Sequence, residues 1–389
     1  MQQTFTNTRA LIGGKLKDNV NITTENGKIV AVGEQKLGKI VDCAGKICCA
    51  GYIDVHTHGG WGKDCMQATP QTIDIISKYH LSTGVTSFAP TTMTASPSDI
   101  NRAVDNLRRY NGKYSRPLGA HLEGPYLSAA AAGAHPKNLL LNPVEENQSF
   151  VWENIDAVSR ITLAPNLVGS AEFCKKASER GIQVSLGHDN SIDDEINACV
   201  DAGATSVTHM YNCTSRPSRR QNPKKHLGLT EIGLIDNRLV CEVIADNRHV
   251  PNALFGMIYK LKGWQNICLV SDSLSVAGMP QGNYYLGDGD SKQEIAVQDG
   301  VAVLPSENTY AGSITPISKM AKDLRAIGYP TEECLAMASL VPSRLLRLAD
   351  RGDLVVGMLA DINLLDEKLE IIDTYLGGEK VDKQSLTRD

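Results

Sequence analysis

The sequence predicts an α/β protein, with a (β/α)8 barrel and a small β domain built from both ends of the chain. Strand-like and helix-like segments alternate through the middle of the sequence, whereas both ends carry strand-like runs only. The composition agrees with this prediction. With 42% hydrophobic residues, 5% aromatic residues and 34 glycines in 389 residues, the chain suits a large core with many tight turns better than an all-β binding module.

Eight apolar runs in the middle of the chain are predicted to be parallel strands. They are short and rich in Val and Ile, as expected of strands that are buried on both faces. The runs are 53–58, 85–90, 118–123, 161–165, 182–188, 206–211, 240–246 and 267–272. Helical segments follow most of them, for example 71–82, 192–201 and 252–261. Eight such units favour a (β/α)8 barrel, which we place at residues 51–345.

The two ends of the chain are predicted to meet in one small β domain, residues 1–50 and 346–389. Residues 8–33 form short strand-like runs around Asn26-Gly27, which is a strong hairpin signal. Two further apolar runs, 361–365 and 369–375, precede a predicted turn at Gly377-Gly378.

Charge and cysteine usage restrict the partners and the compartment. The net charge is −5 and the only basic stretch, 216–225, is local, so we expect no nucleic-acid partner. Residues 1–20 contain no apolar run typical of a signal peptide, and no stretch approaches the roughly 18 apolar residues of a membrane span. The ten cysteines form no C-x-x-C pair, which indicates reduced and mostly buried thiols. We therefore expect a cytoplasmic protein without a membrane partner.

Side chains that can bind a metal stand where the predicted strands end. They are His56 and His58, Glu123, His188, His209 and Asp272. The carboxyl ends of parallel barrel strands converge on one face, where barrel enzymes carry out chemistry. Imidazole and carboxylate donors suit zinc or iron with open positions for water. The sequence therefore predicts one or two divalent ions, with zinc as the expected metal and iron as the alternative.

Some of these residues have a more specific expected role. His56 and His58 lie on the same side of a strand, because side chains alternate with a period of two. Glu123 has two oxygens and is placed to bridge two ions, while Asp272 needs a partner such as an ion-bound water, since an unpaired buried charge is unfavourable. We expect His121, His80 and His226 to be supporting, structural or solvated histidines.

The motifs and their order resemble those of the N-acetylglucosamine-6-phosphate deacetylase family, within the amidohydrolase superfamily. The motifs are Gly51-Tyr52-Ile53-Asp54-Val55-His56-Thr57-His58-Gly59, His121-Leu122-Glu123-Gly124-Pro125, Gly187-His188, Thr208-His209-Met210-Tyr211-Asn212, Ile244-Ala245-Asp246, Ser271-Asp272 and Ala311-Gly312-Ser313. The resemblance implies a distorted (β/α)8 metal-dependent hydrolase barrel with a small β-sandwich from both termini. It also implies a homodimer, and hydrolysis of the acetamide of an amino-sugar 6-phosphate.

The resemblance also implies roles for individual residues. Glu123, His188 and His209 match the main metal ligands of the family, and His56 and His58 match a variable position that allows a second ion. Asp272 matches the catalytic acid/base, and His135 matches a residue at the substrate carbonyl and the sugar. The residues matched to the sugar phosphate are Asn212, Cys213, Arg220 and His249, with the arginine reaching across from the partner subunit.

Departures from the family pattern surround the sugar and the phosphate rather than the metal. They include Asn212-Cys213-Thr214, the basic loop 215–226, Asp246-Asn247-Arg248 and Ser273-Leu274-Ser275. They leave the sugar epimer open, so N-acetylgalactosamine 6-phosphate stays an alternative substrate, and Arg219 stays an alternative to Arg220.

Two competing functions fit part of the same pattern. One is a dihydroorotase-like or N-acyl-amino-acid hydrolase, and the bridging place of Glu123 speaks against it. The second is a non-catalytic sugar-phosphate sensor, and the presence of Asp272 speaks against it, because a sensor needs no acid/base.

Overall fold

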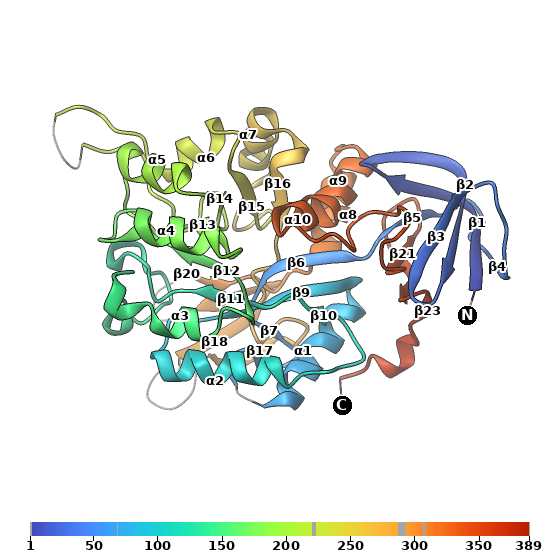
Figure 1. Ribbon diagram of the computed structural model, residues 1–389, viewed down its shortest axis with the longest axis horizontal. Coiled ribbons are helices and arrows are strands. Elements are labelled where there is room, and N and C mark those ends of the chain that lie inside the picture. The colour runs from blue at the N-terminus through green and yellow to red at the C-terminus, as the bar shows by residue number, and fades with distance from the viewer. Residues whose placement is uncertain (1, 68, 220–222, 287–292, 306–308, 389) are drawn as a thin grey trace.

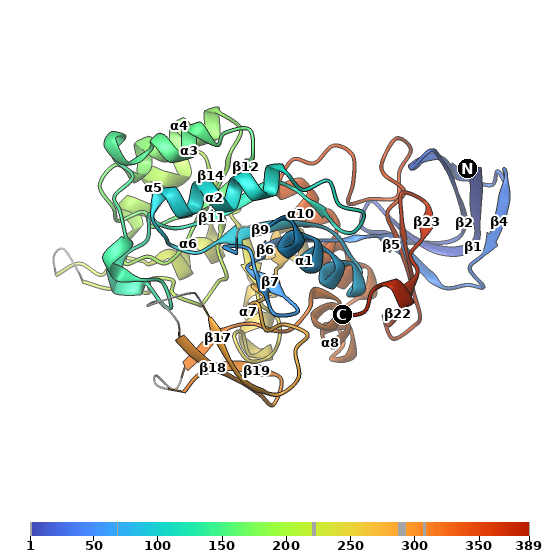
Figure 2. The same cartoon turned by 90° about the horizontal axis from the view of Figure 1, so that it is seen from below.

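The computed structural model describes residues 2–67, 69–219, 223–286, 293–305 and 309–388 (Figure 1). Its strands form one nine-stranded sheet, one eight-stranded sheet, one four-stranded sheet and a two-stranded hairpin. The nine-stranded sheet is the barrel, and the eight-stranded sheet lies beside it at one end of the molecule (Figures 1 and 2). No helix in these ranges is long and apolar enough to cross a membrane.

The barrel strands pair in parallel and in chain order. They are β6 (Tyr52–Thr57), β9 (Val85–Thr92), β11 (Ala120–Glu123), β12 (Val158–Leu163), β13 (Gln183–Leu186), β14 (Ala204–Val207), β15 (Val240–Val243) and β16 (Ile267–Leu269), with the short β10 (Arg116–Pro117) added beside β9. Each of the eight predicted runs overlaps one of the eight barrel strands, so the (β/α)8 prediction is confirmed.

The barrel closes between its last and first strands just beyond the end of β16. The backbone N–H of Asp272 donates to the carbonyl of His56 over 2.9 Å, and Thr57 and Ser273 form a parallel bridge. The buried Asp54 carboxylate accepts the Ser271 hydroxyl and the backbone N–H groups of Ser271 and His56. This closure brings the predicted ligands of the first and eighth strands together.

Helices cover the outside of the barrel, in the alternation that the sequence predicts (Figure 1). They are α1 (Pro70–Ser82), α2 (Pro97–Arg108), α3 (Ser149–Glu153), α4 (Ser170–Glu179), α5 (Asp193–Asp201), α6 (Leu229–Ile235), α7 (Asn252–Lys262), α8 (Ile317–Ala326), α9 (Thr331–Ala338) and α10 (Leu340–Leu345). The Thr69 and Ser96 side chains cap the N-termini of α1 and α2 and accept backbone N–H groups of the first turn. Helices and strands share one continuous apolar core.

The two ends of the chain form the eight-stranded sheet, as predicted. Its strands are β1 (Gln2–Ile12), β2 (Lys15–Glu25), β3 (Lys28–Gly33), β4 (Lys39–Asp42), β5 (Ile47–Ala50), β21 (Ile362–Leu365), β22 (Ile371–Leu376) and β23 (Glu379–Lys380). Asn26 and Gly27 turn between β2 and β3 with φ of 50° and 81°, which confirms the hairpin signal. The sheet has a separate core that includes Phe5, Ile22 and Tyr375. The exact domain limits stay a prediction.

A four-stranded antiparallel sheet between β16 and α8 was not predicted. Its strands are β17 (Gly282–Leu286), β18 (Gln293–Gln298), β19 (Val301–Leu304) and β20 (Thr309–Gly312), and it stands to one side of the barrel in Figure 2. It buries a small core of its own, including Ile295 and Val297. Beyond β20 the chain returns to the barrel, where the Leu274 N–H donates to the Ser313 carbonyl over 3.0 Å. A short hairpin of β7 (Gly59–Gly60) and β8 (Lys63–Asp64) follows β6.

Candidate active site

One buried carboxylate, Glu123 at the end of β11, faces five histidines, which are two pairs and, at the edge, His135. Its Oε1 lies 3.0 Å from Nε2 of His209 and 3.3 Å from Nε2 of His188. Its Oε2 lies 3.1 Å from Nε2 of His58 and 3.4 Å from Nε2 of His56. Each carboxylate oxygen therefore points at one pair of imidazoles, which is the arrangement that a bridging ligand between two ions requires.

Asp272 completes the second pair. Its Oδ1 lies 3.3 Å from Nε2 of His56 and 3.3 Å from Nε2 of His58. The potential ligand atoms form two compact groups, each within 4.8 Å, namely His56 with His58 and Asp272, and Glu123 with His188 and His209. All six residues that the sequence placed at the strand ends thus lie together.

Three of these residues lie just beyond a strand in a left-handed backbone conformation. The φ angles are 47° at His188, 28° at His209 and 46° at Asp272. Residues other than glycine adopt this region at a cost of about 1 kcal/mol or more, and such residues cluster at functional sites. The turn after the strand directs each side chain into the mouth of the barrel.

Hydrogen bonds fix the tautomers of two histidines. Nδ1 of His188 donates to the Ala131 carbonyl over 2.9 Å, and Nδ1 of His209 donates to the Asn212 carbonyl over 3.0 Å. Each neutral ring therefore carries its lone pair on Nε2. The two Nε2 atoms lie only 3.0 Å apart, so two lone pairs point at one another. A proton or a cation held by both nitrogens would relieve this contact, and zinc takes such nitrogen and oxygen donors.

The charges of the site also fit a cation. Burial alone lowers the pKa of His56, but the Glu123 and Asp272 carboxylates outweigh it and raise that pKa to about 9. Burial also lowers the pKa of His58, but Asp272 and Glu123 outweigh it and raise that pKa to about 10. Burial alone raises the pKa of Glu123, but His56 and the other histidines outweigh it and hold that pKa well below its usual range. The ionised carboxylates therefore require positive charge beside them.

His135 has the opposite tautomer from His188 and His209. The backbone N–H of Thr94 donates to Nδ1 of His135 over 3.2 Å, so the proton of the neutral ring is on Nε2. Burial lowers the pKa of His135 to about 4, which keeps the ring neutral at neutral pH. Its Nε2 lies 3.4 Å from Oε2 of Glu123 and thus at the edge of the ligand cluster. His135 is suited to donate a hydrogen bond there rather than to bind a metal.

A second polar group lies on the loop after β15. Nδ1 of His249 donates to Oδ2 of Asp246 over 2.7 Å, while its buried Nε2 has no hydrogen-bond partner in the described part of the chain. Tyr310 of β20 lies against the imidazole, with ring centroids 5.0 Å apart. The four-stranded sheet, which was not predicted, thus places Tyr310 beside the imidazole of His249, whose Nε2 has no partner among the described residues.

The other residues assigned to the sugar phosphate are placed less directly. The Asn212 amide donates to the His209 and Met210 carbonyls and braces the loop after β14. Cys213 is partly exposed and raises the pKa of the neighbouring His188, although burial of that imidazole acts in the opposite direction. Arg219 is exposed, and Arg220 lies outside the described residues. The other nine cysteines are buried, and all ten are free thiols, in agreement with the sequence.

The three remaining predicted histidines are buried and hydrogen-bonded. His121 contacts the hydroxyls of Thr91 and Thr162, and His80 of α1 contacts Thr57. His226 bonds Asp193 over 2.6 Å, and with Asp194 they form a further group of potential ligand atoms. None of the three belongs to the two groups around Glu123.

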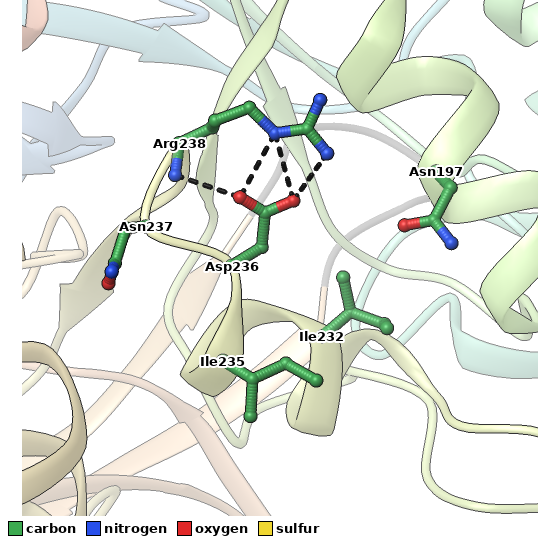
Figure 3. Close-up of a pocket in the computed structure, with 6 residues that line it drawn as sticks. All are labelled: Asn197, Ile232, Ile235, Asp236, Asn237 and Arg238. Carbon is green, nitrogen blue, oxygen red and sulfur yellow. Dashed lines mark hydrogen bonds and ion pairs between the residues drawn. The ribbon is translucent and has the colours of Figure 1, made fainter.

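Figure 3 shows a hollow formed by α5, α6 and the loop before β15. It is lined by Asn197, Ile232, Ile235, Asp236, Asn237 and Arg238. The loop enters the amino end of β15, whereas the Glu123 cluster lies at the carboxyl ends of the strands. Asp236 and Arg238 pair with each other, so their charges are compensated within the hollow. We therefore place the chemistry at the Glu123 cluster.

Sequence reasoning missed two buried charges beneath the cluster. Arg160 of β12 and Glu242 of β15 are fully buried and form an ion pair inside the barrel. A signal was present, because each is a charged residue within an apolar strand. Thr94, which sets the tautomer of His135, was missed too, and its role depends on contacts between distant segments.

Comparisons with known proteins agree with this geometry. The amidohydrolase family pattern matches residues 47–381. The N-acetylglucosamine-6-phosphate deacetylase of Homo sapiens is 33% identical, over 97% of this chain and 95% of that protein. The crystal structure of the deacetylase of the same name from Thermotoga maritima has a TM-score of 0.85 at 28% identity, over 97% of this chain and 99% of that one.

A further solved structure includes a ligand. It is a mutant of the N-acetyl-D-glucosamine-6-phosphate deacetylase from Mycobacterium smegmatis in complex with N-acetyl-D-glucosamine-6-phosphate. It has a TM-score of 0.85 at 26% identity, and covers 97% of this chain and 99% of that one. These similarities extend over nearly the whole chain, which includes the barrel strands and the two groups of potential ligands. The chain therefore belongs to the N-acetylglucosamine-6-phosphate deacetylase family of the amidohydrolases.

Proposed function

We propose that this protein hydrolyses the acetamide of N-acetylglucosamine 6-phosphate, giving glucosamine 6-phosphate and acetate. The observation that carries the proposal is the Glu123 carboxylate between two histidine pairs, with Asp272 and His135 at the same place. The relatives named above support the choice of substrate, since one of them is a complex with this amino-sugar phosphate.

The metal ligands that we propose are His56, His58, Glu123, His188, His209 and Asp272. A mixed nitrogen and oxygen donor set favours zinc, with iron as the alternative. When bound, a divalent ion polarises the acetamide carbonyl and lowers the pKa of a water molecule from about 16 towards about 7.

Asp272 serves as the acid and base in this scheme. Burial opposes its ionisation, but His56 and the other nearby histidines outweigh burial and lower its pKa to about 2, so the group is an ionised carboxylate at neutral pH. It takes the proton of the attacking water as the oxygen bonds to the carbonyl carbon. It then passes this proton to the amine nitrogen as the C–N bond breaks. The Nε2–H of His135 donates to the carbonyl oxygen, on which negative charge develops.

The phosphate orients the substrate from the far end. We assign it to His249, whose buried Nε2 has no partner among the described residues. Nδ1–H donates to Asp246, so the ring binds phosphate in the form that carries a second proton, with Nε2–H donating to a phosphate oxygen. Asn212 and Cys213 contact the sugar phosphate, and Arg220 reaches it from the partner subunit of a homodimer. Holding a remote group positions the amide for attack. A cytoplasmic location, expected from the sequence, stays a prediction.

The decisive experiment measures acetate release by zinc-loaded or iron-loaded protein. The substrates are N-acetylglucosamine 6-phosphate, N-acetylgalactosamine 6-phosphate and the two unphosphorylated sugars. We expect turnover of the first and little turnover of the free sugars. Preference for the second would correct the sugar epimer, and absence of acetate from metal-loaded protein would refute the deacetylase proposal.

A further inference from the structure

Two buried polar atoms face one another beneath the ligand cluster. Nδ1 of His56 has no hydrogen-bond partner among the described residues, and the same is true of Oε2 of Glu242. The two atoms are 3.9 Å apart, and both side chains are fully buried. A buried carboxylate oxygen without a donor is unfavourable, and so is a buried imidazole nitrogen without a partner. Each atom is therefore the natural partner of the other.

The remaining contacts of Glu242 aim this oxygen at His56. Its other oxygen, Oε1, accepts from Arg160, from Ser206 Oγ over 2.8 Å and from Ser185 Oγ over 3.1 Å. Arg160 also donates to the carbonyl of Val55 over 2.6 Å, and Val55 directly precedes His56. The pair thus ties β12 and β15 to the strand that carries the ligand.

We infer that Glu242 is a positioning residue for the metal site formed by His56, His58 and Asp272. Its negatively charged Oε2, 3.9 Å from Nδ1 of His56, favours the proton on that nitrogen, so that the lone pair of Nε2 faces Glu123 and Asp272. Arg160 compensates the buried charge of Glu242 and holds its orientation. His188 and His209 obtain the same tautomer from backbone carbonyls, whereas His56 depends on a side chain. Loss of a partner that orients a metal-binding histidine typically weakens metal binding 10- to 100-fold.

This inference rests on the proposed metal centre, and its test does not use turnover. The single variant Glu242→Gln leaves Arg160 as an unpaired buried charge and risks misfolding. The informative variant is therefore Arg160→Met/Glu242→Met, which removes both charges and the acceptor facing Nδ1 of His56 and keeps a similar volume. Ser206→Ala is the matched control, because it removes a donor to the other oxygen of the same carboxylate.

Zinc binding is measured by competition with a chelator, together with the absorption spectrum of the cobalt-substituted protein. We expect two ions per chain in the wild type and in Ser206→Ala. In the double variant we expect the second ion to bind 10- to 100-fold more weakly, with the first ion unaffected. Histidine 15N NMR reports the tautomer, and the Nδ1–H signal of His56 is expected only where Glu242 is present.

Three results would overturn the inference, one in the double variant and two in the wild type. One is a folded double variant that binds both ions with wild-type affinity. The others are a wild type that takes up only one ion and a wild type in which His56 carries its proton on Nε2. Acetate release by the wild type is measured separately, so failure of the positioning role is distinguishable from failure of the deacetylase proposal.

Discussion

The buried ion pair beneath the site gives a sharp test of how burial sets the stability contribution of a charge. Arg160→Met removes the guanidinium, which contacts Glu242 and the Val55 carbonyl, and leaves the Glu242 carboxylate with two serine hydroxyls. A hydrogen bond to a charged group contributes about 1.5–3 kcal/mol. Breaking a buried pair by deleting one partner typically costs about 3–5 kcal/mol. We therefore expect Arg160→Met to lower the free energy of unfolding by about 3–5 kcal/mol.

Urea unfolding of the zinc-saturated protein measures this loss. The control is Arg238→Met, since Arg238 also contacts two carboxylates, Asp236 and Asp201, but its side chain is 55% exposed. We expect no measurable change for this exposed arginine, because water and side-chain entropy offset such pairs. The reasoning fails if Arg160→Met loses less than about 1 kcal/mol, or if both arginines give equal losses.

Three further predictions concern the site. Asp272→Asn keeps at least one ion, measured by elemental analysis, but lowers kcat by about 10²- to 10⁴-fold, because a positioned acid and base is lost; activity within a few-fold of wild type would exclude this role. His209→Ala loses the ion that it shares with His188, whereas His80→Ala, which removes a buried histidine outside both groups, retains the wild-type metal content. His249→Gln raises KM for the phosphorylated sugar by about 10- to 100-fold, the equivalent of one hydrogen bond to a charged group, and leaves the weak turnover of the free sugar unchanged.

The barrel could be predicted from the sequence because each of its strands is buried on both faces. Runs such as 161–165 and 267–272 are mostly apolar, and a helical segment follows most of the runs. The sheet of β17–β20 lacks this signature. In β19 buried and half-buried residues alternate, so only a weak period of two remains. The Asp299-Gly300 turn was the strongest local sign of a hairpin there.

The gathering of the proposed ligands was predictable for a similar topological reason. His56, Glu123 and Asp272 follow different strands, and a parallel barrel brings all such ends to one face. Residues that act through a second side chain have no comparable pattern of positions in the sequence. Glu242 and His56 are far apart in the sequence, and Thr94 reaches His135 from the loop after β9. Only the tertiary structure shows which nitrogen of each imidazole has a partner.

The contacts that orient the proposed metal ligands also fix the loops of the proposed substrate pocket. The Ala131 carbonyl, which accepts a hydrogen bond from His188, lies on the loop that leads to His135. The Asn212 carbonyl, which accepts a hydrogen bond from His209, adjoins Cys213. Because these acceptors are backbone carbonyls of loops, each hydrogen bond fixes a loop as well as a ring. An ion held by His188 and His209, as proposed, would thereby order the segments proposed to meet the acetamide and the sugar. Under the proposed function, this shared framework would couple metal binding to substrate binding, since a site is effective when its supporting contacts hold it in the productive geometry.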